Sequence, residues 1–270
     1  MSWVEAKGVR YFYRVLNNSG KKTVVMLHGL FSNHTLYYRL GATDLANAGY
    51  RVVMPDLRGH GLSDSSERGF TVNEMAEDVL DLMDALGIGQ TAIVGYSWGG
   101  SIAIQALIDQ PERFWSTVLI EPSGLVEEDL ELINFEEGGV DNYLDDYAST
   151  TRIPVNDRER VLFKARVEVF RKRGLMEAMR ADCDYLVNAD LGSIHCPAIV
   201  LGGKQSILLA DAKLAAQRIE GSRFVMTEGN HYFPMIQTKW VKKQLVGFIL
   251  NTEKQIGADH RRGVQVSQAW

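Results

Sequence analysis

The sequence predicts an α/β protein built on a doubly wound, mostly parallel sheet with an inserted helical cap. Three observations support this class: short apolar runs recur along the chain, helical patterns lie between them, and one long helical stretch interrupts the alternation. Uniformly apolar short runs are typical of strands buried on both faces of a parallel sheet. Strands that alternate with helices require right-handed crossovers, so helices are expected on both faces of the sheet.

The strands are assigned from composition and turn signals. Residues 3–6 and 9–15 flank a Lys-Gly turn and are expected to pair as an antiparallel hairpin at the sheet edge. The first parallel strand is expected at 23–27, where every residue after the threonine is apolar. Comparable runs are predicted to complete the sheet at 51–54, 91–94, 117–120, 198–201 and 223–226.

The clearest helical pattern covers residues 72–86, where apolar residues recur at helical spacing. Thr71 and Glu74 have the spacing of a capping box, in which each side chain bonds the backbone N–H of the other residue. Gly87 can adopt the left-handed conformation that ends a helix. We therefore predict a helix with a defined start and a defined end.

The chain divides into a core and an insertion. Residues 1–124 and 191–250 are assigned to the α/β core, and residues 125–190 to the helical cap, because no strand-like run appears between them. Acidic side chains gather in the first part of the cap and basic ones in the next part, which we interpret as solvated helix faces that pair with each other. Residues 251–270 are expected to form a polar C-terminal tail that is irregular or disordered.

Composition narrows the classes of partner. The 270 residues, 46% of them hydrophobic, can bury one large core, and the net charge of −5 gives no basic field that would attract nucleic acid. No leader pattern and no run of about eighteen apolar residues appears, so we expect a cytoplasmic protein with no membrane segment. Cys183 and Cys196 lack metal-ligand spacing and are expected to be free thiols. We expect a small apolar molecule as partner and neither metal nor cofactor, and a homodimer is among the assemblies left open.

A candidate nucleophile lies in the sequence Gly-Tyr-Ser-Trp-Gly at residues 95–99, between an expected buried strand and an apolar helical segment. Gly95 and Gly99 are needed because a sharp strand-to-helix turn leaves no room for a Cβ atom. The turn lifts the Ser97 hydroxyl above the sheet at a helix N-terminus, where partial positive charge and free N–H groups favour a developing oxyanion. Ser97 is the predicted nucleophile.

With two further motifs, this chain resembles the α/β-hydrolase family, in its serine hydrolase branch. The sequence His-Gly-Leu-Phe at 28–31 follows the first parallel strand, as the His-Gly loop of the family does. The sequence Asp-Leu-Arg-Gly-His-Gly-Leu-Ser at 56–63 matches the loop after the next strand of the family. The resemblance extends from about residue 3 to residue 250, is weakest in the cap, and implies the α/β-hydrolase fold.

The resemblance also implies an oxyanion hole formed by the backbone N–H groups of Leu30 and Trp98. Gly29 is a weaker candidate for the second donor and is grouped with the residues expected to contact the substrate. Three aromatic residues complete that group, although rings near such a turn are more often simple packing: Phe31, Tyr96 and Phe233.

A serine hydroxyl is a poor nucleophile until a base takes its proton, so a histidine must lie within hydrogen-bonding distance. His231 fits best, because it follows the last predicted strand in a loop at the carboxyl edge of the sheet, where the family places its histidine. His28 and His60 lie in loops where the family uses histidine structurally. The remaining histidines have no such context: His34, His195 and His260.

The third catalytic residue departs from the usual family pattern. Most members take their acid from a Gly-x-x-Asp segment after the penultimate strand, where this chain has Gly-Lys-Gln-Ser ending at Ser206. A serine cannot supply the charge that stabilises an imidazolium. Glu121 is the favoured acid, because it ends the strand expected at 117–120, where some branches of the family place theirs. The alternative is a cap-hinge or surface glutamate. Asp211 is a weaker candidate, because it is expected to cap the next helix.

Two branches with an acid at that position suggest the function. One includes enzymes similar to the zearalenone lactonase and implies a serine esterase or lactonase that cleaves an apolar, cyclic or aromatic ester through an acyl-enzyme. The other includes cofactor-independent dioxygenases, and the same residues would also serve carbon–carbon bond hydrolysis with His231 acting on the substrate. A non-catalytic ligand receptor ranks last. Ser97 disfavours haloalkane dehalogenases and epoxide hydrolases, whose nucleophile is a carboxylate.

Overall fold

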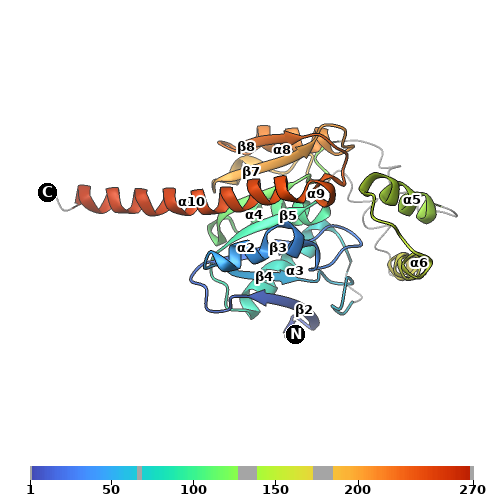
Figure 1. Cartoon of the computed structure of the whole chain (residues 1–270). Helices are drawn as coiled ribbons and strands as arrows, with labels where there is room; N and C mark the ends of the chain where they lie inside the picture. The colour runs from blue at the N-terminus through green and yellow to red at the C-terminus, as the bar shows by residue number, and fades with distance from the viewer. Residues whose placement is uncertain (1, 66–68, 127–138, 173–184, 268–270) are drawn as a thin grey trace.

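A central sheet organises the protein in the computed structural model, which describes residues 2–65, 69–126, 139–172 and 185–267. The described part of the chain forms an eight-stranded sheet in the order β1-β2-β4-β3-β5-β6-β7-β8 (Figure 1). The strands are β1 (Ser2–Ala6), β2 (Val9–Leu16), β3 (Thr23–Leu27), β4 (Arg51–Pro55), β5 (Thr91–Tyr96), β6 (Phe114–Ile120), β7 (Ala198–Gly203) and β8 (Arg223–Thr227). The predicted fold class is confirmed.

The two ends of the sheet differ in strand direction, as expected. β1 and β2 form an antiparallel hairpin through Lys7 and Gly8, whose positive φ angles of 41° and 82° suit a tight turn that matches strand twist. β2 also runs antiparallel to β4, and every later pair in the sheet is parallel. Each residue of β3, β5, β6 and β7 is buried, because helices cover both faces there.

Two layers of helices cover the sheet. One face packs against α3 (Val72–Ala85), α4 (Trp98–Asp109) and α8 (Leu209–Arg218). The other packs against α1 (Leu36–Leu40), α2 (Ala42–Asn47), α9 (Phe233–Ile236) and α10 (Thr238–Ser267), with α10 drawn in red across the sheet in Figure 1. Short 3₁₀ helices at Pro111–Arg113 and Leu191–Ser193 lead into β6 and β7.

The predicted helix at 72–86 corresponds to α3, with the expected boundaries. The Thr71 hydroxyl accepts a hydrogen bond from the Glu74 N–H at 3.3 Å, and the Glu74 carboxylate accepts one from the Thr71 N–H at 3.1 Å. The capping box is therefore complete. Gly87 follows the helix with φ = 63°, the left-handed conformation expected of a helix stop.

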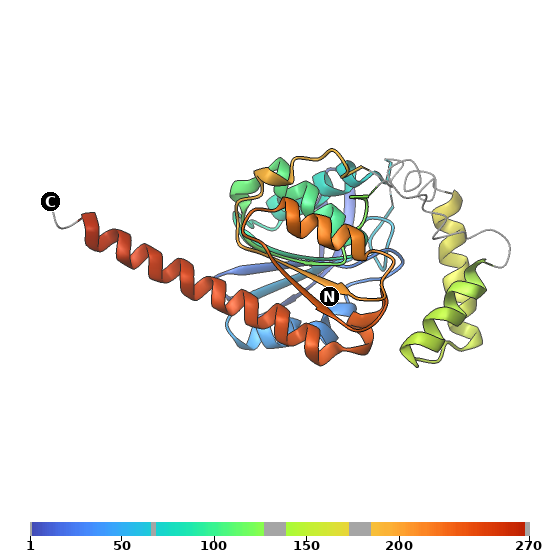
Figure 2. The same ribbon diagram turned by 90° about the horizontal axis from the view of Figure 1, so that it is seen from above.

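The insertion between β6 and β7 contains α5 (Gly139–Thr151) and α6 (Asp157–Lys172). Both helices lie on the side of the sheet away from the C-terminal end of α10 (Figure 2). Asp141 pairs with Lys164 at 2.6 Å, and Asp145 pairs with Arg160, so these acidic and basic faces bind each other as expected. The acidic residues at 127–137 and the segment 173–184 lie outside the described residues.

The expectation of an irregular tail after residue 250 is wrong, because α10 continues as a helix to Ser267. The apolar stripe of the helix crosses residue 250: Thr252 is buried and Ile256 packs against the core. Glu253 accepts a hydrogen bond from the Tyr50 hydroxyl and lies 3.5 Å from the Lys22 ammonium. These contacts hold the helix on the sheet beyond the expected boundary. Within the described ranges, no helix combines the length and the apolar character that crossing a bilayer requires.

Candidate active site

The Gly-x-Ser-x-Gly segment forms a sharp turn between β5 and α4. Ser97 lies in this turn with φ = 54° and ψ = −128°, an unfavourable conformation for a residue with a side chain. A Cβ atom at Gly95 would lie 2.3 Å from the Gly99 carbonyl oxygen, and one at Gly99 would lie 2.4 Å from the His28 carbonyl oxygen. The structure therefore explains both glycines, since only their hydrogen atoms allow the backbone segments to meet.

His231 lies in the loop between β8 and α9, with its ring between two polar partners. Its Nε2 atom is 3.0 Å from Ser97 Oγ, and its Nδ1 atom is 2.7 Å from Glu121 Oε2. The Tyr96 ring stacks on the imidazole at 5.1 Å, and the Tyr96 hydroxyl donates a hydrogen bond to the His231 carbonyl at 2.9 Å. An ionised carboxylate can only accept a hydrogen bond, so the proton of the neutral imidazole must be on Nδ1. Nε2 then has a free lone pair that can accept a proton from the serine.

Glu121 directly follows β6, and its carboxylate is the hydrogen-bond partner of His231 Nδ1. The residue has no solvent exposure, and its φ of 49° shows that the extended backbone of β6 ends at this position. Oε1 accepts a hydrogen bond from the Gly203 N–H at 2.7 Å, and Oε2 accepts one from the Ser206 hydroxyl at 2.7 Å. The alternative of a surface glutamate is therefore excluded. Asp211 instead accepts hydrogen bonds from the N–H groups of residues 125 and 126.

The loop at 28–31 lies directly against the serine turn. A Cβ atom at Gly29 would lie 3.1 Å from the Ser97 Cβ atom, so the following residue, Leu30, is carried to the same edge. Trp98 is the first residue of α4, and the first N–H groups of a helix have no acceptor within the helix. The geometry thus brings both expected oxyanion donors to the neighbourhood of the serine hydroxyl.

The aromatic residues expected to contact substrate have different surroundings. Phe31 is buried with φ = 56°, and its ring lies 5.3 Å from those of Phe163 and Phe170 in α6. Tyr96 is buried, and its ring stacks on the His231 imidazole. Phe233 has no solvent exposure and packs on Trp240 of α10 at 5.9 Å, so the expectation that it contacts substrate is wrong. As the first residue of α9, it turns into the core and supports the His231 loop.

His28, one of the two histidines expected to be structural, has partners in two loops. His28 is fully buried, accepts a hydrogen bond at Nε2 from the Leu57 N–H at 3.0 Å, and has Nδ1 2.8 Å from the Gly29 carbonyl oxygen. Burial, with a smaller contribution from nearby His60, lowers the pKa of His28 to about 3. These contacts agree with the structural role expected for His28, which is a neutral link between two loops.

Sequence reasoning missed the partner of His34. Its backbone N–H and its Nδ1 atom lie 2.8 and 2.7 Å from Asp56 Oδ1, while Oδ2 of the same carboxylate accepts from the Leu62 N–H. Asp56 is the first residue of the 56–63 motif, so the histidine fastens that loop to the one after β3. The motif pointed to Asp56, but no sequence pattern pointed to its partner.

Sequence reasoning also missed a group of tyrosines between the cap and the His231 loop. The Tyr232 ring lies 6.0 Å from His231 and contacts the rings of Tyr143 and Tyr147 in α5 at 6.1 and 5.3 Å. Tyr143 stacks on Phe163 of α6 at 5.5 Å. Burial raises the pKa of all three hydroxyls, so they stay protonated near neutral pH. The i, i+4 spacing of the two α5 tyrosines was the available signal.

Cys196 is a half-buried free thiol, and burial raises its pKa to about 12, so it is not a reactive thiolate. Cys183 lies outside the described residues. Among the residues that the structure describes, histidine, cysteine and carboxylate side chains form no group of three that could hold a metal ion.

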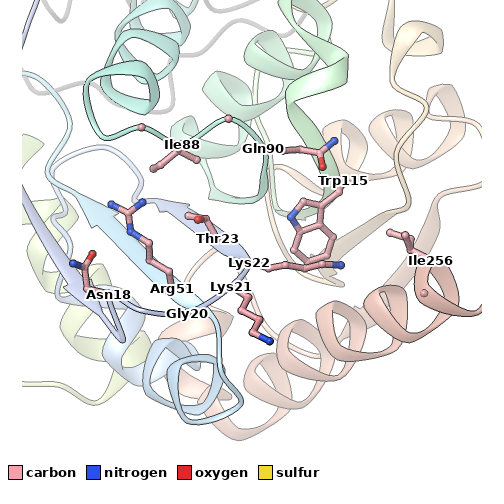
Figure 3. A pocket seen from close by; sticks show the side chains of 13 residues that line it. Asn18, Gly20, Lys21, Lys22, Thr23, Arg51, Ile88, Gln90, Trp115 and Ile256 are labelled. Carbon is pink, nitrogen blue, oxygen red and sulfur yellow. The ribbon is translucent and has the colours of Figure 1, made fainter. Parts of the chain in front are cut away.

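A cavity of about 620 Å³ lies at the edge of the sheet opposite to the edge that carries Ser97 (Figure 3). Thr23, Arg51 and Trp115 line it from the amino ends of β3, β4 and β6, together with Lys21 and Lys22. Parallel strands carry their amino ends on the edge away from Ser97, so this cavity is not part of the serine site.

The comparison with protein families agrees with this geometry. The model of the α/β hydrolase fold family matches residues 22–175, which is more than half of the chain. The protein belongs to the α/β hydrolase fold family, as the motifs at 28–31, 56–63 and 95–99 implied.

The individual relatives carry names of different activities, a hydrolase and an acetyltransferase component among them. The chain is 39% identical over 133 residues to a 2-hydroxy-6-oxo-6-phenylhexa-2,4-dienoate hydrolase of Burkholderia cepacia, covering 45% of this chain and 44% of the relative. It is 36% identical over 122 residues to the dihydrolipoyllysine-residue acetyltransferase component of the acetoin cleaving system of Cupriavidus necator, covering 45% and 32%. The matches therefore span less than half of each curated relative. Among solved structures, the N-acyl homoserine lactone degrading enzyme Est816 is 26% identical, with a TM-score of 0.73 and coverage of 92% and 100%.

Proposed function

We propose that the protein is a serine hydrolase that cleaves an ester or lactone of an apolar, cyclic or aromatic small molecule through an acyl-enzyme at Ser97. One observation carries the proposal: Ser97 Oγ, the His231 ring and the Glu121 carboxylate form a continuous hydrogen-bonded series, with distances of 3.0 and 2.7 Å. A nucleophile, a base and a buried acid in this order can activate a serine hydroxyl at neutral pH.

In the proposed reaction, Ser97 Oγ attacks the carbonyl carbon while His231 Nε2 takes its proton. Glu121 stabilises the resulting imidazolium, and the N–H groups of Leu30 and Trp98 donate hydrogen bonds to the oxyanion. The imidazolium then protonates the leaving oxygen as the carbon–oxygen bond breaks. Water, deprotonated by His231, attacks the acyl-enzyme, releases the acid and restores the serine. A lactone would yield one hydroxy acid.

The surroundings of Ser97 support an apolar, planar substrate. Rings from three separate segments gather around the triad: Phe31 from the loop after β3, Tyr143 and Phe163 from the cap, and Tyr232 from the His231 loop. Aromatic rings favour flat apolar ligands through burial and stacking. The similarity to an N-acyl homoserine lactone degrading enzyme supports a lactone as one form of the ester.

A second candidate function is carbon–carbon bond hydrolysis next to a carbonyl group. The similarity to the 2-hydroxy-6-oxo-6-phenylhexa-2,4-dienoate hydrolase favours it, and that substrate also carries an aromatic ring. The same three residues would serve this reaction, so the triad alone does not distinguish it from ester hydrolysis.

The test is mass spectrometry of the protein after treatment with a fluorophosphonate, alongside turnover of p-nitrophenyl acetate, a macrocyclic lactone and the phenylhexadienoate above. Ser101→Ala is the matched control for Ser97→Ala, because Ser101 lies one turn further along α4 and donates its hydroxyl proton to the Ser123 carbonyl at 2.8 Å. We expect labelling at Ser97 and ester or lactone turnover, both lost in Ser97→Ala and kept in Ser101→Ala.

Turnover of the dienoate without turnover of either ester would replace the first candidate function with the second. Both candidate functions would be overturned if Ser97 stayed unlabelled and none of the three substrates were turned over. Oxygen uptake with aromatic heterocycles would then be measured.

A further inference from the structure

Ser206 lies in the loop between β7 and α8 and contacts the acid of the triad. We propose that Ser206 is a positioning residue that fixes the Glu121 carboxylate against His231, and that position 206 can itself carry the acid. The inference rests on the proposed function, because it assigns Ser206 a role in orienting the acid of the proposed triad. Ser206 Oγ is 2.7 Å from Glu121 Oε2, the same oxygen that faces His231 Nδ1.

The hydroxyl of Ser206 can donate in one direction only. The Leu208 N–H lies 3.1 Å from Ser206 Oγ and donates to it, so the serine oxygen is the acceptor in that contact. Its own proton is then directed to Glu121. The Ser206 N–H donates to the Gly203 carbonyl at 3.1 Å, which fixes the backbone from which the hydroxyl projects. Donor direction and donor position are thus both set by the loop.

Glu121 needs such fixation more than a shorter acid would. Its side chain has three rotatable bonds and begins from a backbone with φ = 49°, so its carboxylate can miss the imidazole in several rotamers. It is fully buried, and three protein donors surround its oxygens: the Gly203 N–H on Oε1, and Ser206 and His231 on Oε2. Loss of Ser206 would leave Oε2 with His231 as its only partner among these three.

Position 206 also has the geometry to carry a carboxylate. An aspartate extends one bond further than a serine from the same Cβ atom. If Glu121 is shortened to alanine, an aspartate at 206 can place an oxygen in the space that Glu121 Oε2 leaves. The acid would then approach His231 Nδ1 from β7 instead of β6. We therefore interpret Ser206 as the hydrogen-bond partner of the acid, which in this chain is at position 121, and not as an acid position that has lost its function.

The experiment compares four variants with the wild type: Ser206→Ala, Ser206→Thr, Glu121→Ala and Glu121→Ala/Ser206→Asp. Ser222→Ala is the matched control, because Ser222 lies in the loop after α8 and its hydroxyl also donates one hydrogen bond, to the Ala216 carbonyl at 2.6 Å. Turnover of p-nitrophenyl acetate gives kcat and KM, and the rate of fluorophosphonate labelling measures Ser97 reactivity directly. Melting temperature and circular dichroism verify that each variant is folded.

For Ser206→Ala we expect kcat to fall roughly tenfold with KM nearly unchanged, since only the orientation of the base is affected. Ser206→Thr keeps the hydroxyl and is expected to restore kcat to within about threefold of the wild type. Glu121→Ala is expected to lose about a thousandfold, and the double variant to regain at least roughly tenfold over it. Ser222→Ala is expected to behave as the wild type.

Two results would overturn the inference while leaving the proposed function intact. One is an unchanged kcat in a folded Ser206→Ala; the other is a folded double variant that labels and turns over no faster than Glu121→Ala. Failure of the proposed function is recognised separately, because the wild type would then neither hydrolyse the ester nor label at Ser97.

Discussion

The core and the cap both contribute residues around Ser97, but different interactions hold them. In the core, Ser97 and Glu121 have positive φ angles of 54° and 49°, and the buried residues of neighbouring strands hold them there. In the cap, α5 and α6 bind each other through ion pairs such as Asp145–Arg160, whose carboxylate side chain is 64% exposed. Strained, functional backbone persists only where its surroundings enforce it. The core thus suits a fixed chemistry, and the cap suits adjustable substrate selection.

The largest expected effect is a loss of core stability at low pH, through the buried residue His28. Below pH 6.5 the unfolded chain protonates His28, whereas the native state excludes that proton until about pH 3, so stability falls as the pH falls between these values. We expect a loss of up to roughly 5 kcal/mol from this residue across the window. Urea unfolding at several pH values checks it. The variant His28→Asn should be less stable at pH 7 and should show a shallower slope; parallel curves would contradict the assignment.

Gly99→Ala should disrupt the core next to the nucleophile. The new Cβ atom would lie 2.4 Å from two carbonyl oxygens, those of Leu27 and His28. These are backbone atoms of a buried strand and its loop, so relieving the overlap would require the backbone to shift. We expect a loss of about 3 kcal/mol or more in unfolding free energy, together with loss of activity. Gly247→Ala in α10 is the control, because its Cβ would meet nothing within 4 Å, and up to about 1 kcal/mol of stabilisation is expected. Equal effects would refute the steric explanation.

Phe163→Ala tests the contact between cap and core. Its ring lies 5.3 Å from Phe31 and 5.5 Å from Tyr143, so its loss should loosen the cap above the site. We expect KM for an aromatic ester to rise roughly tenfold, and unfolding free energy to fall by about 1–2 kcal/mol, less than for a core phenylalanine. The neighbouring Leu162→Ala, 56% exposed, should change neither quantity. If kcat fell instead of KM rising, the cap would be part of the chemistry.

The smallest effect is expected for the cap ion pairs. Asp145→Asn removes a pair in solvent, where the Coulomb gain is offset by side-chain ordering and screened by salt. We expect the melting temperature to shift by less than about 2 °C at physiological salt. Calorimetry of this variant checks the value, and a shift as large as that of Phe163→Ala would mean that charge contributes as much as ring packing to holding the cap.

The strands and the serine turn could be predicted from the sequence because their signals are local. The apolar run at 23–27 and the glycines at 95 and 99 depend on chain neighbours and steric limits. Glu121 required one further argument, the absence of a carboxylate at Ser206. Other features arise from contacts between distant segments and left no local signal, including the burial of Phe233 against Trp240 and the pairing of His34 with Asp56.

The length of α10 has a practical consequence for how the protein can be handled. Its 30 residues correspond to about 45 Å of helix, and its C-terminal end projects from the side of the body away from α5 and α6 (Figures 1 and 2). A solid support, fluorophore or fusion partner coupled at that end would be separated from the Ser97 edge by the width of the molecule. Immobilisation through α10 should therefore leave substrate entry unobstructed.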